Sequence, residues 1–268
     1  MQTGFYANTG GMVTQFNRLD VISNNLANVN TTGFKRDDVV IGDYMRLYQE
    51  QRDILPLENN TKEGSKFLNR SIVRVPQVVE EYTDLQLGGL AKTGNPLDVA
   101  LAQPNTFYAV STPAGVRYTR DGSFKVNEQG TLVNSEGHPV LSRGGETITL
   151  PEDQRITVDS EGNIYGKSET TLTQDVLVGQ LQVARFENPK WLEKVGNNLY
   201  TTDQVPVLAE GTNFTAQGFI EKSNVNAVSE MTALIETNRL VGMYQKVMDT
   251  HMNDMNEQAI SKLGSISA

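Results

Sequence analysis

The chain has no cysteine, one tryptophan and only two histidines among its 268 residues. Without cysteine it cannot form disulfides, use a thiol in catalysis or bind a metal through sulfur. His138 lies in a Gly-His-Pro turn, His251 lies within a helical pattern, and no Gly-x-Ser-x-Gly turn accompanies either of them. A histidine-based nucleophilic site therefore has no support. We predict no catalytic residue, no cofactor and no metal site.

Clustered positive charge and long apolar runs are also missing. The formal net charge is -9, and no segment is rich in lysine and arginine. Nucleic acids and anionic membranes are held chiefly by clustered cations, and a membrane span needs roughly 18 apolar residues, so we expect neither partner. The first twenty residues lack the basic and apolar regions of a cleavable secretory signal. If the protein leaves the cytoplasm, we expect it to use another route.

A helical pattern occupies the first 28 residues. Apolar side chains recur there every seven residues, with one more between the second and the third: Phe5, Met12, Leu19 and Leu26, and Phe16. This heptad-like stripe predicts an amphipathic helix. Gly10 and Gly11 each cost about 1 kcal/mol relative to alanine inside a helix. We therefore expect the helix to be marginal on its own.

A longer helical pattern runs from about Val225 to Leu263. Two rows recur every seven residues: Ala227, Leu234, Val241, Met248 and Met255 in one, and Met231, Asn238, Gln245, Met252 and Ala259 in the other. We expect Thr237 and Lys246 to point away from this stripe. Because the stripe is narrow and rich in adaptable methionine, two arrangements remain open. The helix packs on its own domain, or it pairs with the N-terminal helix and with neighbouring subunits.

Between about Leu85 and Ile220 the period changes to two, which is typical of strands. Short strand-like runs alternate with turn signals: 106–111, 116–119, 123–126, 131–133, 156–166 and 197–202. Such spacing favours an antiparallel meander or barrel. Residues 37–84 fit neither period and are expected to be an extended connector. The predicted fold is thus α+β and mainly β, with 85–224 as a β-rich outer domain and 1–36 pairing with 225–268 as an inner helical domain.

Two acidic turns need a separate explanation. Asp159 to Asn163, with the sequence DSEGN, faintly resembles a calcium loop but lacks the length and the terminal glutamate of an EF-hand, so we predict a hairpin turn. Asp121 is interpreted as a turn aspartate before a glycine with positive φ, Gly122. A pair of catalytic carboxylates cannot be selected from sequence, because their spacing is spatial.

The stretch ISNNLANVNTTGFKR, residues 22–36, places many turn-forming residues directly after the first helical stripe. Four asparagines, Asn24, Asn25, Asn28 and Asn30, can bond the free backbone groups where a helix ends. Gly33 permits a reversal with positive φ, and Phe34 can then dock as an apolar anchor. We expect strain at Gly33 to stay local to a turn that leads the chain out of the helical layer.

The segment SNNLANVNTTGFKR resembles the N-terminal signature of the bacterial flagellar rod and hook protein family. NPLDVAL (95–101), YTRDGSFKVNEQGTLV (118–133) and GHPVL (137–141) resemble its β-domain motifs, and QGFIEKSNVNAVSEMTALIETNR (217–239) resembles its C-terminal signature. Within the family the pattern is most similar to the proximal rod branch, and the distal rod branch is the alternative. The family often has a Gly-x-Gly-Phe-Phe run where this chain has QPNTFYAV, and arginine where it has Asn95.

This resemblance implies a structural subunit of the flagellar basal-body rod and no enzyme. Its partners would be further copies of itself, other rod proteins and the flagellar type III export apparatus, and its place the periplasmic rod. A coiled-coil layer of terminal helices would carry the assembly contacts. The candidate assembly residues are Phe5, Met12, Phe16, Leu19, Asn25, Leu26, Asn28, Gly33, Phe34, Met231, Leu234, Val241, Met248, Met252 and Met255. A periplasmic binding module and a carbohydrate-active enzyme are alternatives from other classes.

Overall fold

The computed structural model describes residues 2–43, 76–151, 154–168, 176–209 and 213–266. The chain divides into two compact units. Unit 1 comprises Met1–Leu26, Asp37–Tyr82 and Ala227–Ala268, and unit 2 comprises Ala27–Arg36 and Thr83–Asn226. No helix in the described ranges is long and apolar enough to cross a membrane.

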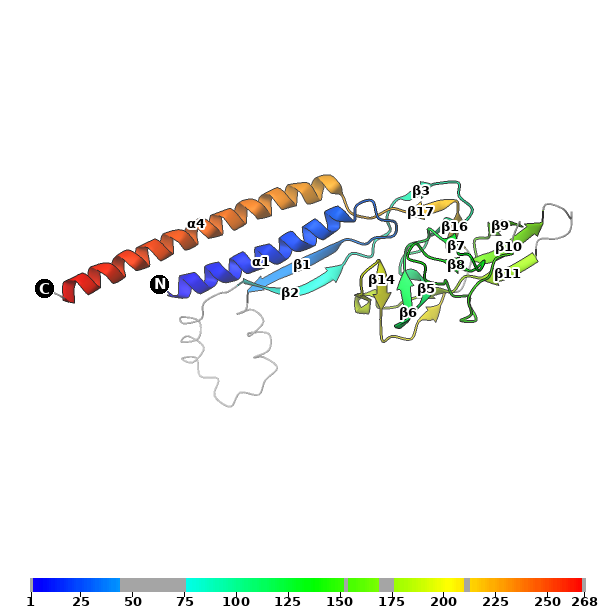
Figure 1. Cartoon of the computed structure of the whole chain (residues 1–268), viewed down its shortest axis with the longest axis horizontal. Helices are drawn as coiled ribbons and strands as arrows, with labels where there is room; N and C mark the ends of the chain where they lie inside the picture. Colours follow the sequence, from blue (N-terminus) through cyan, green and yellow to red (C-terminus); the bar gives the residue numbers. More distant parts are fainter. Residues whose placement is uncertain (1, 44–75, 152–153, 169–175, 210–212, 267–268) are drawn as a thin grey trace, which may run out of the picture. The chain divides into compact units, whose positions relative to one another are not determined.

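Unit 1 is built on two helices, α1 (Gln2–Ala27) and α4 (Ala227–Ile266), which lie side by side and run in opposite directions (Figure 1). The Asn8 side chain donates to the Tyr244 carbonyl at 3.1 Å, and the Thr9 hydroxyl lies 3.9 Å from the Met248 sulfur. A Cβ on Gly11 would lie 2.7 Å from the Tyr244 ring, so this glycine leaves room for that ring against α1. The helices predicted at both ends of the chain are confirmed.

Unit 1 also contains a two-stranded sheet of β1 (Asp37–Asp43) and β2 (Pro76–Thr83) (Figure 1). The sequence predicted an extended connector over residues 37–84, and these two paired strands replace it at both of its described ends. The residues between the two strands lie outside the described ranges. β-branched valines in both strands, such as Val39 and Val79, favour the extended conformation that the periodicity did not reveal.

Unit 2 is a set of small antiparallel sheets. Its largest sheet has six strands in the order β13-β14-β6-β5-β12-β15. Those strands are β13 (Glu193–Lys194), β14 (Leu199–Thr201), β6 (Gly115–Thr119), β5 (Thr106–Thr112), β12 (Val183–Arg185) and β15 (Val207–Leu208). A second sheet has the order β11-β10-β9, from β11 (Val176–Gln180), β10 (Asn163–Ser168) and β9 (Gln154–Val158).

Three further strand pairs complete unit 2. They are β16 (Thr215–Gln217) with β4 (Val99–Leu101), β17 (Phe219–Glu221) with β3 (Leu90–Lys92), and β7 (Lys125–Val126) with β8 (Leu132–Val133). A short 3-10 helix, η1 (Pro189–Trp191), precedes β13. The predicted strands are thus present, and they form open sheets over the described residues.

Two apolar cores hold these sheets together. One lies between the sheets and includes Leu101, Tyr108 and Val140; the other lies on the opposite side of β5 and includes Phe107, Phe186 and Tyr200. Alternate residues of β5 enter different cores, as the pleat of a strand requires. Both faces of β5 are therefore buried, which holds this strand in place.

Candidate functional site

The helices of unit 1 meet along a seam made mostly of polar or small residues. On α1 the buried positions that repeat along one face are Asn8, Gly11, Gln15, Ile22 and Asn25. On α4 the corresponding row is Glu230, Thr237, Tyr244 and His251, alternating with Leu234, Val241 and Met248. Each set keeps the alternation of three and four residues that antiparallel helix packing requires. We call these residues the helix seam.

The seam does not coincide with the predicted stripe of α1. Met12, Leu19 and Leu26 are half-buried beside it, and the Phe16 side chain is 43% exposed. The side chain of Phe5 lies outside the described part of the structure. The sequence analysis assigned burial from apolar character, but this helix buries Asn8 and Gly11 against α4 instead.

On α4 one predicted row is buried within the chain and its companion row is exposed. Leu234 and Met248 are half-buried in the seam, and Val241 is buried there, so these three lie where the chain packs on itself. Met231 and Met252 are 51% and 50% exposed, and the side chain of Met255 lies outside the described part. Thr237, expected to point away from the stripe, is only 1% exposed. That expectation was wrong. The row that contains Thr237, three residues after Leu234, completes the seam, whereas the row that contains Met231, three residues before Leu234, is exposed.

Apolar side chains on both helices remain uncovered within this chain. Each of the following is at least 38% exposed: Val13 and Phe16 on α1, and Val228, Met231, Ile235, Leu240, Met243, Val247 and Met252 on α4. On α4 most of them form two flanks, separated by a row of exposed polar residues: Thr232, Arg239, Lys246 and Asn253. We call the exposed apolar set the uncovered helix face. Exposed apolar side chains gathered on two flanks of one helix make this face the candidate surface for contacts with other molecules.

The turn segment, Ala27–Arg36, is folded into unit 2. Gly33 has φ of +67°, which confirms the predicted reversal. Its amide donates to the Glu221 carbonyl at 2.8 Å. A Cβ at this position would lie 2.5 Å from the carbonyl carbon of Arg120 and 2.6 Å from the amide of Asp121. Strain at Gly33 is therefore not confined to its own turn, as the sequence had suggested, since it would reach the backbone of the β-rich unit.

Phe34 is 6% exposed, which confirms that it docks as an anchor. The Lys194 ammonium lies 4.2 Å from the centre of its ring and donates to the Lys35 carbonyl at 2.6 Å. The Thr32 hydroxyl donates to the Asp121 carboxylate at 2.6 Å, and the Asn198 amide donates to the Thr32 carbonyl at 2.7 Å. Contacts from several strands of unit 2 thus hold the turn segment.

Two of the asparagines in this stretch have distinct partners. Asn25 donates to the Asp37 carbonyl at 2.7 Å and accepts from the Asp37 amide at 2.9 Å, so its side chain pairs with β1 as a neighbouring strand would. Asn28 accepts through its carbonyl from the Thr31 amide and through its side chain from the Thr31 hydroxyl. The predicted bonding of backbone groups by an asparagine side chain is confirmed for Asn25, which reaches a strand instead of the helix end. The Asn28 side chain bonds a hydroxyl, and its main-chain carbonyl closes the turn.

Beneath the turn segment lies a buried ion cluster of Lys35, Arg120 and Glu221. The Lys35 ammonium and the Glu221 carboxylate are 2.5 Å apart, and Arg120 contacts the other carboxylate oxygen at 2.7 and 2.8 Å. All three residues are about 1% exposed. Burial lowers the pKa of Lys35 below its ordinary value, and the nearby Glu221 charge offsets this only in part. Sequence reasoning missed the cluster, although each member lies in one of the quoted motifs.

The remaining polar turns have structural partners. Asp121 accepts from Thr32, Ser123 and Ser135. The positive φ expected at Gly122 is wrong: its φ is not positive, and its glycine is needed because a Cβ would meet the Val99 carbonyl oxygen. Asp159 forms the predicted hairpin turn between β9 and β10. Burial raises the pKa of the Asp159 carboxyl, but hydrogen bonds from Asn163 and Glu161 outweigh it and leave that pKa below its ordinary value.

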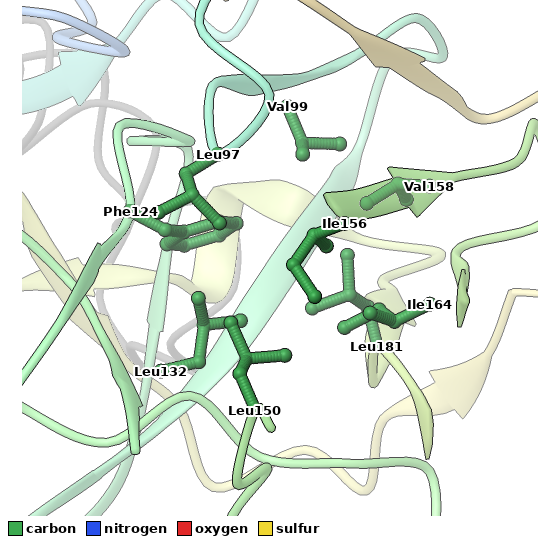
Figure 2. Close-up of a pocket in the computed structure, with 9 residues that line it drawn as sticks. All are labelled: Leu97, Val99, Phe124, Leu132, Leu150, Ile156, Val158, Ile164 and Leu181. Atoms are coloured by element: carbon green, nitrogen blue, oxygen red, sulfur yellow. The ribbon is translucent and has the colours of Figure 1, made fainter. Parts of the chain in front are cut away.

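The hollows of unit 2 do not resemble a catalytic site. One cavity has a volume of about 10 Å³. The apolar side chains that line it, including Val99, Phe124 and Leu181, are drawn in Figure 2. This cavity is about the size of one water and offers that water no polar partner, so it is a gap in the core. A groove of about 380 Å³ near Pro96 and Arg155 has one carboxylate, Glu128, among the lining residues that the structure describes. Glycoside hydrolysis needs two. No cluster of three metal-binding side chains occurs within the described ranges.

Three family models match successive parts of the chain. Residues 5–35 match the model described as flagella basal body rod protein, and residues 103–166 match that of the flagellar hook protein FlgE/F/G D1 domain. Residues 216–262 match the flagellar basal body rod FlgEFG protein C-terminal model. The first and last matches cover the parts of the chain that carry α1, the turn segment, β17 and much of α4.

Curated relatives align over nearly the whole chain. The flagellar basal-body rod protein FlgG of Buchnera aphidicola subsp. Schizaphis graminum is 33% identical over 265 residues, which cover 96% of each chain. The flagellar basal-body rod protein FlgF of Caulobacter vibrioides is 32% identical over 270 residues, and that of Mesorhizobium japonicum is 33% identical over 270 residues. Both of these alignments cover all of each chain.

Proposed function

The chain belongs to the flagellar basal-body rod protein family, and we propose that it polymerises as a subunit of the proximal rod, the helical shaft that crosses the periplasm and transmits torque for motility. As a member of this family it is a structural protein of the flagellar basal body and no enzyme.

The observation that carries the proposal is the uncovered helix face. Within the chain, α1 and α4 bury Asn8, Gln15 and Thr237, while Phe16 and Met243 remain 43% and 55% exposed. A self-contained domain has the reverse distribution, because burial of apolar area, at about 25 cal/mol per Å², is the main stabilising term. The helices are therefore suited to obtain their apolar packing from other subunits.

This arrangement also fits a tube. The two apolar flanks of α4 lie on different sides of the polar row that includes Arg239 and Lys246, so each flank can meet a different neighbour. Contacts between non-identical surfaces generate an open helix when the rotation between subunits does not close a ring. Obligate interfaces of this sort are large and apolar, as torque transmission requires.

Two relatives named FlgF align over all of both chains, which supports the proximal rod over the distal rod. The FlgG relative is equally similar in identity, so a distal rod subunit is the second candidate. A strain lacking this chain distinguishes the two. If the chain is the proximal subunit, basal bodies of that strain should stop before the distal rod and lack a separate FlgG-like protein. If they instead retain a separate FlgF-like protein and stop after it, the chain is the distal subunit.

The chain assembles with other rod components, and for its specific partners we propose further copies of itself and the adjoining rod proteins. We also propose export by the flagellar type III apparatus. Helices that depend on neighbours for their apolar packing suit this route, because such helices are marginal in isolation and complete their packing only on assembly.

The test is to charge the uncovered helix face. Met231→Asp and Met252→Asp each place a carboxylate on a side chain that is half exposed in the single chain, so the isolated protein is expected to fold normally. In the assembled rod the same carboxylate would be buried without a partner, at a cost of several kcal/mol. We expect cells carrying either variant to be non-motile and their basal bodies to lack hook subunits.

Thr232→Asp is the matched control, since Thr232 lies on the exposed polar row of the same helix. It adds the same charge and should leave motility unchanged. Normal swimming by the two methionine variants would contradict assembly through this face and favour a self-contained binding module.

A further inference from the structure

Three charged residues from distant parts of the chain meet beneath the turn segment. Lys35 belongs to the turn segment, Arg120 follows β6, and Glu221 ends β17. We propose that this ion cluster makes docking of the turn segment conditional on Glu221, so that the segments leading to both helices become fixed to unit 2 in one event. The proposal rests on contacts inside unit 2 and is independent of the rod assignment.

Arg120 and Lys35 differ in the contacts that they make apart from Glu221, and this difference indicates the order in which the segments dock. Arg120 donates to the Gln103 carbonyl at 2.9 Å and to the Thr106 carbonyl at 2.6 Å, and it contacts the Phe107 ring. These partners, next to or within β5, hold Arg120 without help from the turn segment. The β-rich unit therefore forms, by itself, a carboxylate-binding site at Arg120.

Lys35 has no such independent support. Its ammonium donates to Glu221 and to the Gln86 carbonyl at 2.6 Å. Without the Glu221 carboxylate, docking the turn segment would bury a second cation beside Arg120 with one backbone oxygen as partner. Leaving a buried charge without its counter-ion is strongly unfavourable. The turn segment can therefore dock only after Glu221 has paired with Arg120.

Backbone contacts extend the same dependence to both chain ends. Gly33 donates to the Glu221 carbonyl, and the Arg36 amide donates to the Asn224 side chain at 2.8 Å. α1 ends six residues before Gly33, and α4 begins six residues after Glu221. One docking event thus fixes the segments that lead out of α1 and into α4, and a chain that has not yet delivered β17 leaves the turn segment free.

Hydrogen exchange on the full chain tests this order. In Lys35→Met the Arg120–Glu221 pair remains, so unit 2 should still fold; in Glu221→Gln the charge partner of Lys35 is lost. We expect amides of residues 28–36 to exchange about 100-fold faster or more in Glu221→Gln. Amides of β5 and β6 should keep their protection in Lys35→Met. In Glu221→Gln they should lose less protection than residues 28–36, because Arg120 loses its carboxylate partner but keeps the Gln103 and Thr106 carbonyls. Lys222→Met, which removes an exposed cation next to Glu221, is the control and should exchange as the wild type does.

The double variant Lys35→Met with Glu221→Gln separates a conditional contact from an ordinary one. With Lys35 absent, losing Glu221 should affect residues 28–36 less than it does in the presence of Lys35. Wild-type protection of residues 28–36 in Glu221→Gln would overturn the proposal. So would equal loss of protection in β5, β6 and the turn segment, which would show that the ion cluster supports the whole unit and not this docking event.

Discussion

Replacing Gly33 by alanine should destabilise unit 2, although Gly33 lies in a turn next to a helix. Two separate costs apply. Left-handed backbone costs a non-glycine residue about 1 to 2 kcal/mol. The added Cβ would also overlap the backbone of Arg120 at 2.5 Å, and rigid backbone cannot move aside as a flexible side chain can.

The loss of stability in Gly33→Ala follows from the backbone movement that the added Cβ would require. Moving the two backbones apart weakens the hydrogen bond from Gly33 to Glu221, which is 2.8 Å long. Strain from overpacking is about 1 to 3 kcal/mol and a lost hydrogen bond about 1 kcal/mol, so the sum is about 3 to 6 kcal/mol with the conformational cost. For a domain of this size the melting temperature should fall on the order of 10 °C.

Gly137→Ala is the matched control for Gly33→Ala. Gly137 also has positive φ, +86°, but a Cβ there would meet nothing within 4 Å. It should carry only the conformational cost of about 1 to 2 kcal/mol. Thermal melting followed by near-ultraviolet circular dichroism, which reports on buried Tyr108 and Tyr200, measures both variants. If Gly33→Ala melts at the same temperature as Gly137→Ala, the close approach to Arg120 has no energetic weight and the argument fails.

Three further predictions concern the helices and the turns. Thr237→Asp should reduce the helix content of the monomer, because it buries an unpaired carboxylate at a residue that is 1% exposed; equal circular dichroism of Thr237→Asp and Thr232→Asp would contradict the helix seam. Limited proteolysis of a verified monomer should cut within α1 and α4 early but spare Ala27–Arg36, and early cleavage inside that segment would show that it is not docked. Because the pKa of Asp159 is lowered in the folded chain, its carboxylate should stabilise the fold above the ordinary carboxyl pKa, and this stabilisation should be lost as pH falls through the lower folded pKa. Asp159→Asn should therefore make the free energy of unfolding less dependent on pH in the acid range. An unchanged pH dependence would refute the role of this turn.

Local chemistry made much of unit 2 predictable. Turn residues such as Gly137 and Asp159 mark the ends of short strands, because the conformations that they favour interrupt the period-two pattern. Gly33 was identified for the same reason: an αL position after a helix favours glycine. The extra constraint at Gly33, its approach to Arg120, was not predictable, since it joins residues 87 positions apart.

Apolar periodicity could not predict which residues form the helix seam. That method assumes that the apolar side of a helix is the side buried within its own chain. Here Asn8 and Thr237 are buried while Met231 and Met243 are exposed, and we propose that the exposed apolar residues bind other subunits. A helix that packs on two kinds of partner has more than one buried side, and only one of them is visible in a single chain.

The ion cluster escaped prediction for a different reason. Lysine, arginine and glutamate are ordinarily solvated at the surface, so a single charged residue in a motif carries no sign of burial. Pairing Lys35 with Glu221 requires knowledge that residues 186 positions apart meet. The only hint in the sequence is that each of the three lies next to residues that shape the backbone, such as Gly33 and Gly122.

The central claim, that the uncovered helix face is covered by other subunits, can be measured directly because the chain contains no cysteine. Met231→Cys and Met252→Cys each introduce a unique thiol at a half-exposed position. The account predicts rapid labelling of both thiols by a maleimide in the purified monomer and strong protection of both in intact basal bodies isolated from motile cells. Equally rapid labelling in monomer and basal bodies would contradict it.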